Sequence, residues 1–301
     1  MKKATSKNEE HAAYLLFVLP ALIIYVSVMA FPTVFSVILS LTNYSGGKIF
    51  GNSTLAFAGF KSYIRMFTDP SGYFYIALKN NLYIVLVSVF GQIPLGFIIA
   101  YVLSRKIVKG NDFFQTVVYL PNVISPVIIG ILFKAFYLNN DSVVMEILRK
   151  FNPEASNSGG NPMIPVLIVM LWMYTGMYVI IFLANLQRID TSIIEAAKID
   201  GASEGQALYH IIFPALSGVI VTSAILAISG SLKSFDLIYV MTGGGPASRT
   251  SVLSLYMYKS AFQGAPDYPL ANAISTVMVI LSFILIGLTQ AVERKFGGKE
   301  D

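Results

Sequence analysis

Cysteine is absent from this sequence, so the chain can form no disulfide and offers no thiolate ligand to a metal. Charged residues are also scarce: they make up 12% of the 301 residues, whereas ordinary soluble domains carry about 25%. The low charge content argues against a water-soluble fold. The excess of 21 basic over 16 acidic residues does not indicate a nucleic-acid ligand, because the basic residues lie mainly in short segments between apolar runs.

Several signatures of chemistry are missing as well. No Gly-x-x-x-x-Gly-Lys-Ser/Thr phosphate loop occurs, so we expect that the chain does not hydrolyse ATP. The apolar runs lack the His, Asp and Glu clusters of a membrane-embedded enzyme. They also lack the mid-membrane acidic residues and inverted repeats of an ion-coupled secondary transporter. We keep such a transporter as a second alternative. We therefore predict no catalytic residue, no metal and no cofactor.

The sequence is rich in long apolar runs that contain no Asp, Glu, Lys or Arg. These runs cover residues 11–47, 80–104, 113–133, 155–187, 205–232 and 268–292. About 20 apolar residues suffice for a helix to cross a bilayer. Lipid offers the backbone no hydrogen-bond partner, and the runs do not alternate as barrel strands do, so each crossing should be a helix. We predict an all-α integral membrane protein with about six transmembrane helices, at about 12–41, 80–104, 113–137, 163–187, 211–236 and 268–292.

The distribution of Lys and Arg predicts the orientation. The first run follows Lys2 and Lys3 as in a signal peptide, but it is too long for a cleaved segment and has no small-x-small cleavage pattern, so we expect a retained helix. With the amino terminus inside, the segments dense in basic residues all become cytoplasmic. These segments are the amino-terminal tail, the turn at 105–109, the loop after Leu186 and the tail from Arg294. We predict one transmembrane domain, 1–301, with both termini cytoplasmic.

The loop between the fourth and fifth crossings is more structured than a connector needs to be. Ser192 with Glu195 has the Ser-x-x-Glu spacing of a capping box, and Ser203 with Gln206 repeats that spacing. Gly201 lies between the two and can adopt the left-handed conformation that ends a helix. The sequence predicts helix, glycine turn, helix on the cytoplasmic face. Such an element suits a joint that passes the movement of a soluble partner into the membrane.

The same loop, 191–214, resembles that of a known family. Glu195-Ala-Ala, three residues, Gly201, nine residues and then Ile211-x-Phe213-Pro214 is similar to the EAA loop of ABC importer permeases. That pattern reads E-A-A-x-x-x-G, nine residues and I-x-L-P, and only Phe213 departs from it. The resemblance implies docking into a cleft of an ATP-hydrolysing subunit. The matching coupling positions are Glu195, Ala196, Ala197, Asp200 and Gly201.

Other segments narrow the resemblance, which extends from about residue 14 to 292. Segments 31–42, 57–63, 120–126 and 235–246 are similar to the carbohydrate-importer permeases of the maltose type, the last one to the first of their two permeases. The resemblance implies the type I ABC importer permease fold in a prokaryotic cell (inner or plasma) membrane. It implies as partners a second homologous permease, two copies of an ABC ATPase subunit, an extracytoplasmic solute-binding protein, a carbohydrate and membrane lipid, and no nucleic acid.

The candidate solute contacts lie on two helices. Met170, Met173, Tyr174 and Met177 fall at i, i+3, i+4 and i+7 on one face, and this spacing alone favours a packing face. The resemblance implies instead a solute site where the fourth and fifth helices face each other. The matching positions are Met170, Met173, Tyr174, Met177, Ala227, Ser231 and Ser234.

Lys233 and Asp236 are the only charges in the outer half of the predicted fifth helix, and their spacing would let them pair along it. Charges within a membrane favour a functional role, but an interfacial pair with an outward-reaching lysine is the other interpretation. A lysine facing the pathway would favour an acidic sugar or a sugar or glycerol phosphate ester over a neutral carbohydrate. For Glu195 the alternative is a simple capping carboxylate. We expect His210 to be an interfacial side chain.

Overall fold

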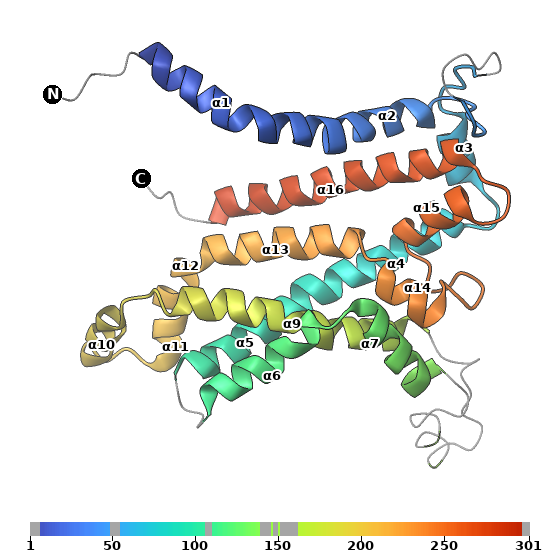
Figure 1. Ribbon diagram of the computed structural model, residues 1–301. Coiled ribbons are helices and arrows are strands. Elements are labelled where there is room, and N and C mark those ends of the chain that lie inside the picture. The colour runs from blue at the N-terminus through green and yellow to red at the C-terminus, as the bar shows by residue number, and fades with distance from the viewer. Residues whose placement is uncertain are drawn as a thin grey trace. The chain divides into compact units, whose positions relative to one another are not determined.

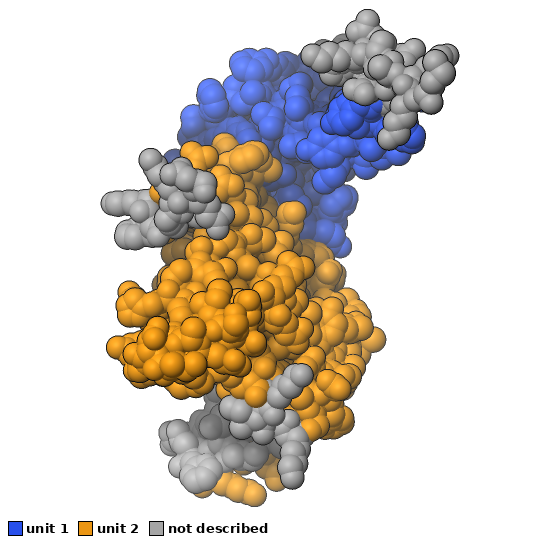
Figure 2. All heavy atoms as spheres, turned by 90° about the vertical axis from the view of Figure 1, so that its left-hand side faces the viewer, with its two compact units in different colours: residues 1–68, 257–277 blue, residues 69–256, 278–301 orange. Residues whose placement is uncertain are grey.

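The computed structural model describes residues 7–48, 55–105, 110–138, 146, 150 and 162–296. Across these residues the secondary structure is helical, apart from a single β-bridge between Thr42 and Phe57. The predicted all-α class is therefore confirmed. The chain divides into two compact units, one made of residues 1–68 with 257–277 and the other of 69–256 with 278–301 (Figure 2).

The first unit contains the amino-terminal helices. They are α1 (Lys7–Tyr25), the π-helical segment η1 (Val26–Ala30), α2 (Phe31–Ser40) and α3 (Lys61–Thr68). Ser36 donates a hydrogen bond of 2.6 Å to Asn272, and Arg65 forms an ion pair of 2.5 Å with Asp267. These contacts tie α2 and α3 to the carboxy-terminal residues of the same unit.

The second unit contains most of the helices. They are α4 (Tyr73–Val87), η2 (Ser88–Gln92), α5 (Ile93–Ser104), α6 (Asn111–Val123), α7 (Pro126–Phe133), η3 (Lys134–Leu138), α9 (Met163–Leu186), α10 (Thr191–Ile199), α11 (Glu204–Ala207), η4 (Leu208–Ile212), α12 (Phe213–Ala215), α13 (Ser217–Leu232) and α14 (Asp236–Thr242). Two further helices are divided between the units: α15 (Leu253–Phe262) and α16 (Tyr268–Phe296).

Three of the π-helical segments have a cause in the sequence. Each ends two residues before a proline: Pro32, Pro94 or Pro214. Proline has no N–H for the carbonyl four residues earlier, and its ring crowds that carbonyl. In each case the residue before the proline bonds to the carbonyl five residues back, as Ile93 does to Ser88. The widened turn lets the helix continue through the proline, so α4, η2 and α5 form one helix from Tyr73 to Ser104.

Four helices in the described part of the chain are long and apolar enough to cross a bilayer: Tyr14–Ser40, Tyr73–Ser104, Met163–Leu186 and Tyr268–Val292. Two bent pairs raise the number to six if each is one span. The pair α6 and α7 is bent by 90°, and the pair from Glu204 to Ala215 and from Ser217 to Leu232 by 65°. The first bend falls where Ile124 and Ser125 are extended before Pro126, as the residue before a proline prefers. The exact crossing boundaries stay a prediction.

The core of the second unit is formed where α5 and α6 run alongside α9 (Figure 1). Phe97 of α5 packs edge-on against Phe182 of α9 at 5.6 Å and stacks on Phe213 at 5.0 Å. Gly176 lets α9 approach α6 closely, because a β-carbon there would lie 2.9 Å from the Tyr119 Cα. Small residues of this kind allow membrane helices to pack by direct backbone contact. This packing fixes the position of α9, which carries part of the candidate site.

Candidate functional site

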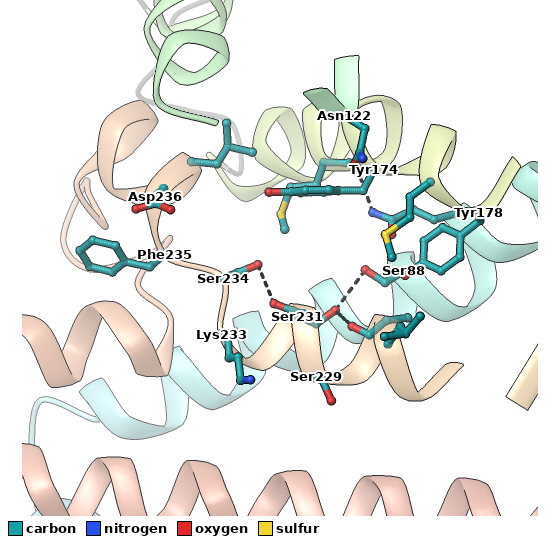
Figure 3. A pocket seen from close by; sticks show the side chains of 17 residues that line it. Ser88, Asn122, Tyr174, Tyr178, Ser229, Ser231, Lys233, Ser234, Phe235 and Asp236 are labelled. Atoms are coloured by element: carbon teal, nitrogen blue, oxygen red, sulfur yellow. Dashed lines mark hydrogen bonds between the residues drawn. The ribbon is translucent and has the colours of Figure 1, made fainter. Parts of the chain in front are cut away.

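A cavity of the second unit with a volume of about 430 Å³ lies between α9 and the break that separates α13 from α14 (Figure 3). Its walls combine apolar groups with hydroxyl, amide and charged groups. The polar side chains are those of Ser88, Gln92, Asn122, Tyr174, Tyr178, Ser229, Ser231, Lys233, Ser234 and Asp236. A cavity of mixed character with several hydrogen-bonding groups suits a small polar ligand.

Most of the predicted solute contacts meet at this cavity. The predicted residues that line it are Met170, Tyr174, Met177, Ala227, Ser231, Ser234, Lys233 and Asp236. Met173 does not line it and is only 1% exposed, as expected for a packing residue. The spacing on α9 therefore places packing and cavity-lining residues on neighbouring parts of one face. Their role as solute contacts stays a prediction.

The hydroxyl of Ser231 joins two walls of the cavity. It donates to the Ala227 carbonyl at 2.7 Å and is also hydrogen-bonded to the Ser88 hydroxyl at 3.1 Å. Gln92 donates a buried hydrogen bond of 3.0 Å to the Met170 carbonyl on α9. The segment η2 is thus bonded to both α13 and α9.

Ser88, Gln92 and Asn122 are cavity residues that the sequence reasoning missed. They lie in the second and third predicted crossings, whereas the predicted solute contacts lie in the fourth and fifth. Ser88 is 4% exposed and Gln92 2% exposed. Polar residues inside an apolar run are a functional signal. Ser88 and Gln92 are polar residues within the run 80–104, so this signal was present in the sequence for both.

The predicted pairing of Lys233 with Asp236 along one helix is wrong. The helix α13 ends at Leu232, and α14 begins only at Asp236. No ion pair joins the two side chains within the described ranges, both residues are exposed, and Figure 3 shows them well apart with Lys233 directed away from Tyr174. Both still border the cavity, near its Ser234 end.

Distant residues support the backbone at this break. Asn81, which is 1% exposed, donates to the Ser231 carbonyl at 3.0 Å and accepts from the Leu253 N–H at 2.8 Å. The Ser254 hydroxyl donates to the Ser234 carbonyl. Backbone groups freed where the helix stops are therefore satisfied within the protein, as an apolar environment requires.

The N-cap of α10 lies two residues earlier than predicted. Asp190, and not Ser192, is the N-cap: its carboxylate accepts from the Ser192 N–H at 2.9 Å, which holds the pKa of Asp190 below its usual value. The proposed capping box of Ser192 and Glu195 is therefore wrong. Glu195 is exposed and takes no part in the cap, so the alternative that it is only a capping carboxylate loses its support.

The glycine turn and the second helix are confirmed. Gly201 has a φ of +88°, and its N–H donates to the Lys198 carbonyl at 3.1 Å while the Ala202 N–H donates to the Ala197 carbonyl at 2.8 Å. This pair of bonds is the Schellman motif. At the start of α11, Ser203 and Gln206 form the predicted reciprocal capping box.

The loop presents an open surface. Glu195, Ala196, Asp200 and Gly201 are exposed, and Ala197 is partly so. A hollow of about 410 Å³ lies between α10 and η4 and is lined by Ala197, Asp200, Gly201, Ala202, Gln206, Ala207, His210 and Ile211. Ile199 on α10 is 87% exposed. Four of the five predicted coupling residues are therefore accessible to a partner protein.

Comparison with known proteins gives consistent matches. Residues 92–298 match the family described as "Binding-protein-dependent transport system inner membrane component". The chain is 33% identical over 285 residues to the multiple sugar-binding transport system permease protein MsmF of Streptococcus mutans, covering 94% of each chain. It is 34% identical over 277 residues to the lactose transport system permease protein LacF of Rhizobium radiobacter, covering 90% of each. A crystal structure of a bacterial alginate ABC transporter shares the fold, with a TM-score of 0.79, 21% identity, and coverage of 97% of this chain and 98% of that chain.

Proposed function

Because the chain belongs to the family of binding-protein-dependent transport system inner membrane components, we propose that it is the permease subunit of an ATP-driven ABC importer for a carbohydrate. One observation carries this proposal. The helix, Schellman turn and helix of 191–212 stand exposed between α9 and α13, the two helices that form opposite walls of the cavity. A partner that binds the exposed loop would act directly on both walls.

Two of the relatives and the cavity together support a neutral carbohydrate. Two relatives are named as permeases for multiple sugars and for lactose. The cavity offers hydroxyl and amide groups, which suit the hydroxyl groups of a sugar. Lys233 and Asp236 both border it, so their formal charges offset each other. This balance favours a neutral sugar over the acidic sugar or phosphate ester considered above.

The proposed mechanism is alternating access. A second permease completes the pathway, two ATPase subunits bind the cytoplasmic loops, and an extracytoplasmic solute-binding protein delivers the sugar. ATP closes the ATPase pair, and that movement passes through Glu195, Ala196, Ala197, Asp200 and Gly201 into α9 and α13. This arrangement requires both termini and the 191–214 loop on the cytoplasmic side of the cell membrane, as the distribution of Lys and Arg predicts.

Reconstitution tests the proposed function. We expect the purified chain to show no ATP turnover, because it has no phosphate loop. Co-expression with its ATPase and second permease should give a stable complex whose ATP hydrolysis rises when the sugar-loaded solute-binding protein is added. The measurement is phosphate release and radiolabelled sugar uptake in proteoliposomes. ATP turnover by the isolated chain, or uptake driven by an ion gradient without ATP, would contradict the proposal.

Substitutions in the cavity should lower uptake more than assembly. Ser231→Leu removes the hydroxyl that joins α13 to η2 and fills the cavity, and Tyr174→Ala removes a wall of it. We expect each to reduce the uptake rate roughly tenfold, the effect of losing about one buried hydrogen bond to the solute. The measurement is uptake by equal amounts of assembled complex.

Thr222→Leu is the matched control for Ser231→Leu, because Thr222 lies on the same helix but is exposed, and its hydroxyl donates to the carbonyl of Gly218 within that helix. Tyr174→Phe separates the ring from its hydroxyl. Normal kinetics in both cavity variants would place the solute site elsewhere.

A further inference from the structure

A junction of charged and aromatic side chains joins the 191–212 loop to the end of α5. The Arg105 Nη2 lies 2.7 Å from the Glu204 Oε2, and the Lys198 Nζ lies 2.6 Å from the Glu204 Oε1. The Tyr101 hydroxyl donates to the Glu204 Oε2 at 3.2 Å and accepts from the Arg105 Nη2 at 2.6 Å. Glu204 is the first residue of α11, and its side chain therefore connects α11 to the end of α5 and to α10.

The junction is a network of three charged side chains and a tyrosine, in contrast to an isolated surface ion pair, which contributes little to stability. The Arg105 side chain is only 24% exposed, and its guanidinium lies over the Tyr101 ring at 4.9 Å. Each carboxylate oxygen of Glu204 has its own cation. These contacts, Lys198 first and then Arg105, hold the pKa of Glu204 below its usual value, so the carboxylate is ionised at neutral pH.

The helix that Glu204 contacts leads to the cavity. Arg105 directly follows the continuous helix from Tyr73 to Ser104, whose π-helical segment carries Ser88 and Gln92 in the cavity wall. The loop also connects to the cavity through its covalent neighbours α9 and α13. Without Glu204, no described ion pair would tie the loop to α5, and the η2 wall would be linked to the loop through packing and through the hydrogen bonds that η2 makes to α9 and α13.

We propose that Glu204 is a positioning residue for energy coupling, which holds the loop to the end of α5 so that movement of the loop shifts the cavity wall carrying Ser88 and Gln92. This inference rests on the proposed function. It adds a second mechanical route to the cavity beside α9 and α13. It also assigns a role to a carboxylate outside the E-A-A-x-x-x-G pattern.

The test compares Glu204→Gln, Arg105→Gln and the double variant in the complete importer. Glu204→Gln keeps the side-chain length but removes the charge that attracts both cations. We expect sugar uptake per ATP hydrolysed to fall roughly threefold or more, with the ATPase still bound. Because Arg105 acts through its contact with Glu204, the double variant should be no worse than Glu204→Gln alone. Asp112→Asn, the same chemical change on α6 outside these contacts, should leave the ratio unchanged.

The outcomes separate this inference from the proposed function. If the wild-type complex shows no ATP-driven sugar uptake, the proposed function fails. If the wild type transports and Glu204→Gln keeps the full ratio of uptake to hydrolysis, the positioning role is wrong. Loss of ATPase binding in a pull-down would make Glu204 a docking residue instead, and failure of both single variants to assemble would assign the junction to folding; either result overturns the inference.

Discussion

Gly201→Val should abolish ATP-driven uptake while leaving a normal amount of the protein in the membrane. Gly201 has a φ of +88°, where an L-residue with a β-carbon pays about 1–2 kcal/mol. A β-carbon at Gly201 would meet no heavy atom within 4 Å, so this cost comes from the backbone and not from packing. The chain can relieve the strain only by leaving the left-handed conformation, which breaks the bonds to Lys198 and Ala197 and turns α11 away from α10.

Matched variants isolate the backbone effect. Gly205→Ala adds a β-carbon inside α11, where the space is equally open and φ is helical, so uptake should be unchanged. Glu195→Ala should weaken ATPase binding less than Gly201→Val, because it removes one exposed carboxylate without redirecting the chain. The measurements are a pull-down of the ATPase and an uptake assay on equal amounts of inserted protein. Full uptake by Gly201→Val would falsify the coupling role, and a parallel loss of insertion would assign the glycine to folding alone.

Gly176→Leu should prevent a stable fold altogether. The β-carbon would lie 2.9 Å from the Tyr119 Cα and closer still to the Val118 carbonyl oxygen, and both are backbone atoms that cannot rotate away. The helices α6 and α9 would have to separate, which removes the close packing that holds membrane helices together. We expect destabilisation of about 4 kcal/mol or more, the range of severe overpacking.

The measurement for Gly176→Leu is the yield of monodisperse protein in detergent and its melting temperature. Gly218→Leu on α13 is the control, because a β-carbon at Gly218 would meet nothing within 4 Å. An unchanged melting temperature for Gly176→Leu would mean that α6 and α9 do not approach as closely as described.

Local signals in the sequence were sufficient to predict those elements whose structure depends on residues close in sequence. The apolar runs predicted the helices. Gly201 with Ser203 and Gln206 predicted the turn and the start of α11, because the bonds that define these motifs join residues close in sequence. The cap of α10 was misplaced for a related reason. Ser192 and Asp190 are both good caps, and the helix begins after the first of them.

The break after Leu232 was not predictable from local pattern. The run 205–232 continues smoothly into Lys233, and the outer end of the helix was therefore placed at about 236. What stabilises the break is Asn81, 150 residues away in sequence from the Ser231 carbonyl that it bonds. The candidate cavity could be located by family resemblance on α9 and α13. Ser88 and Gln92 line it through contacts between segments far apart in sequence, in which Gln92 bonds to α9 and Ser88 to α13.

The exposed Ile199 has a consequence for how the cell produces this subunit. If the ATPase covers α10 as we propose, a copy that has not yet assembled carries an isoleucine that is 87% uncovered. Chaperones and proteases act on exposed apolar surface, so unassembled copies would be removed first. The supply of the ATPase would then limit how many copies of the permease survive.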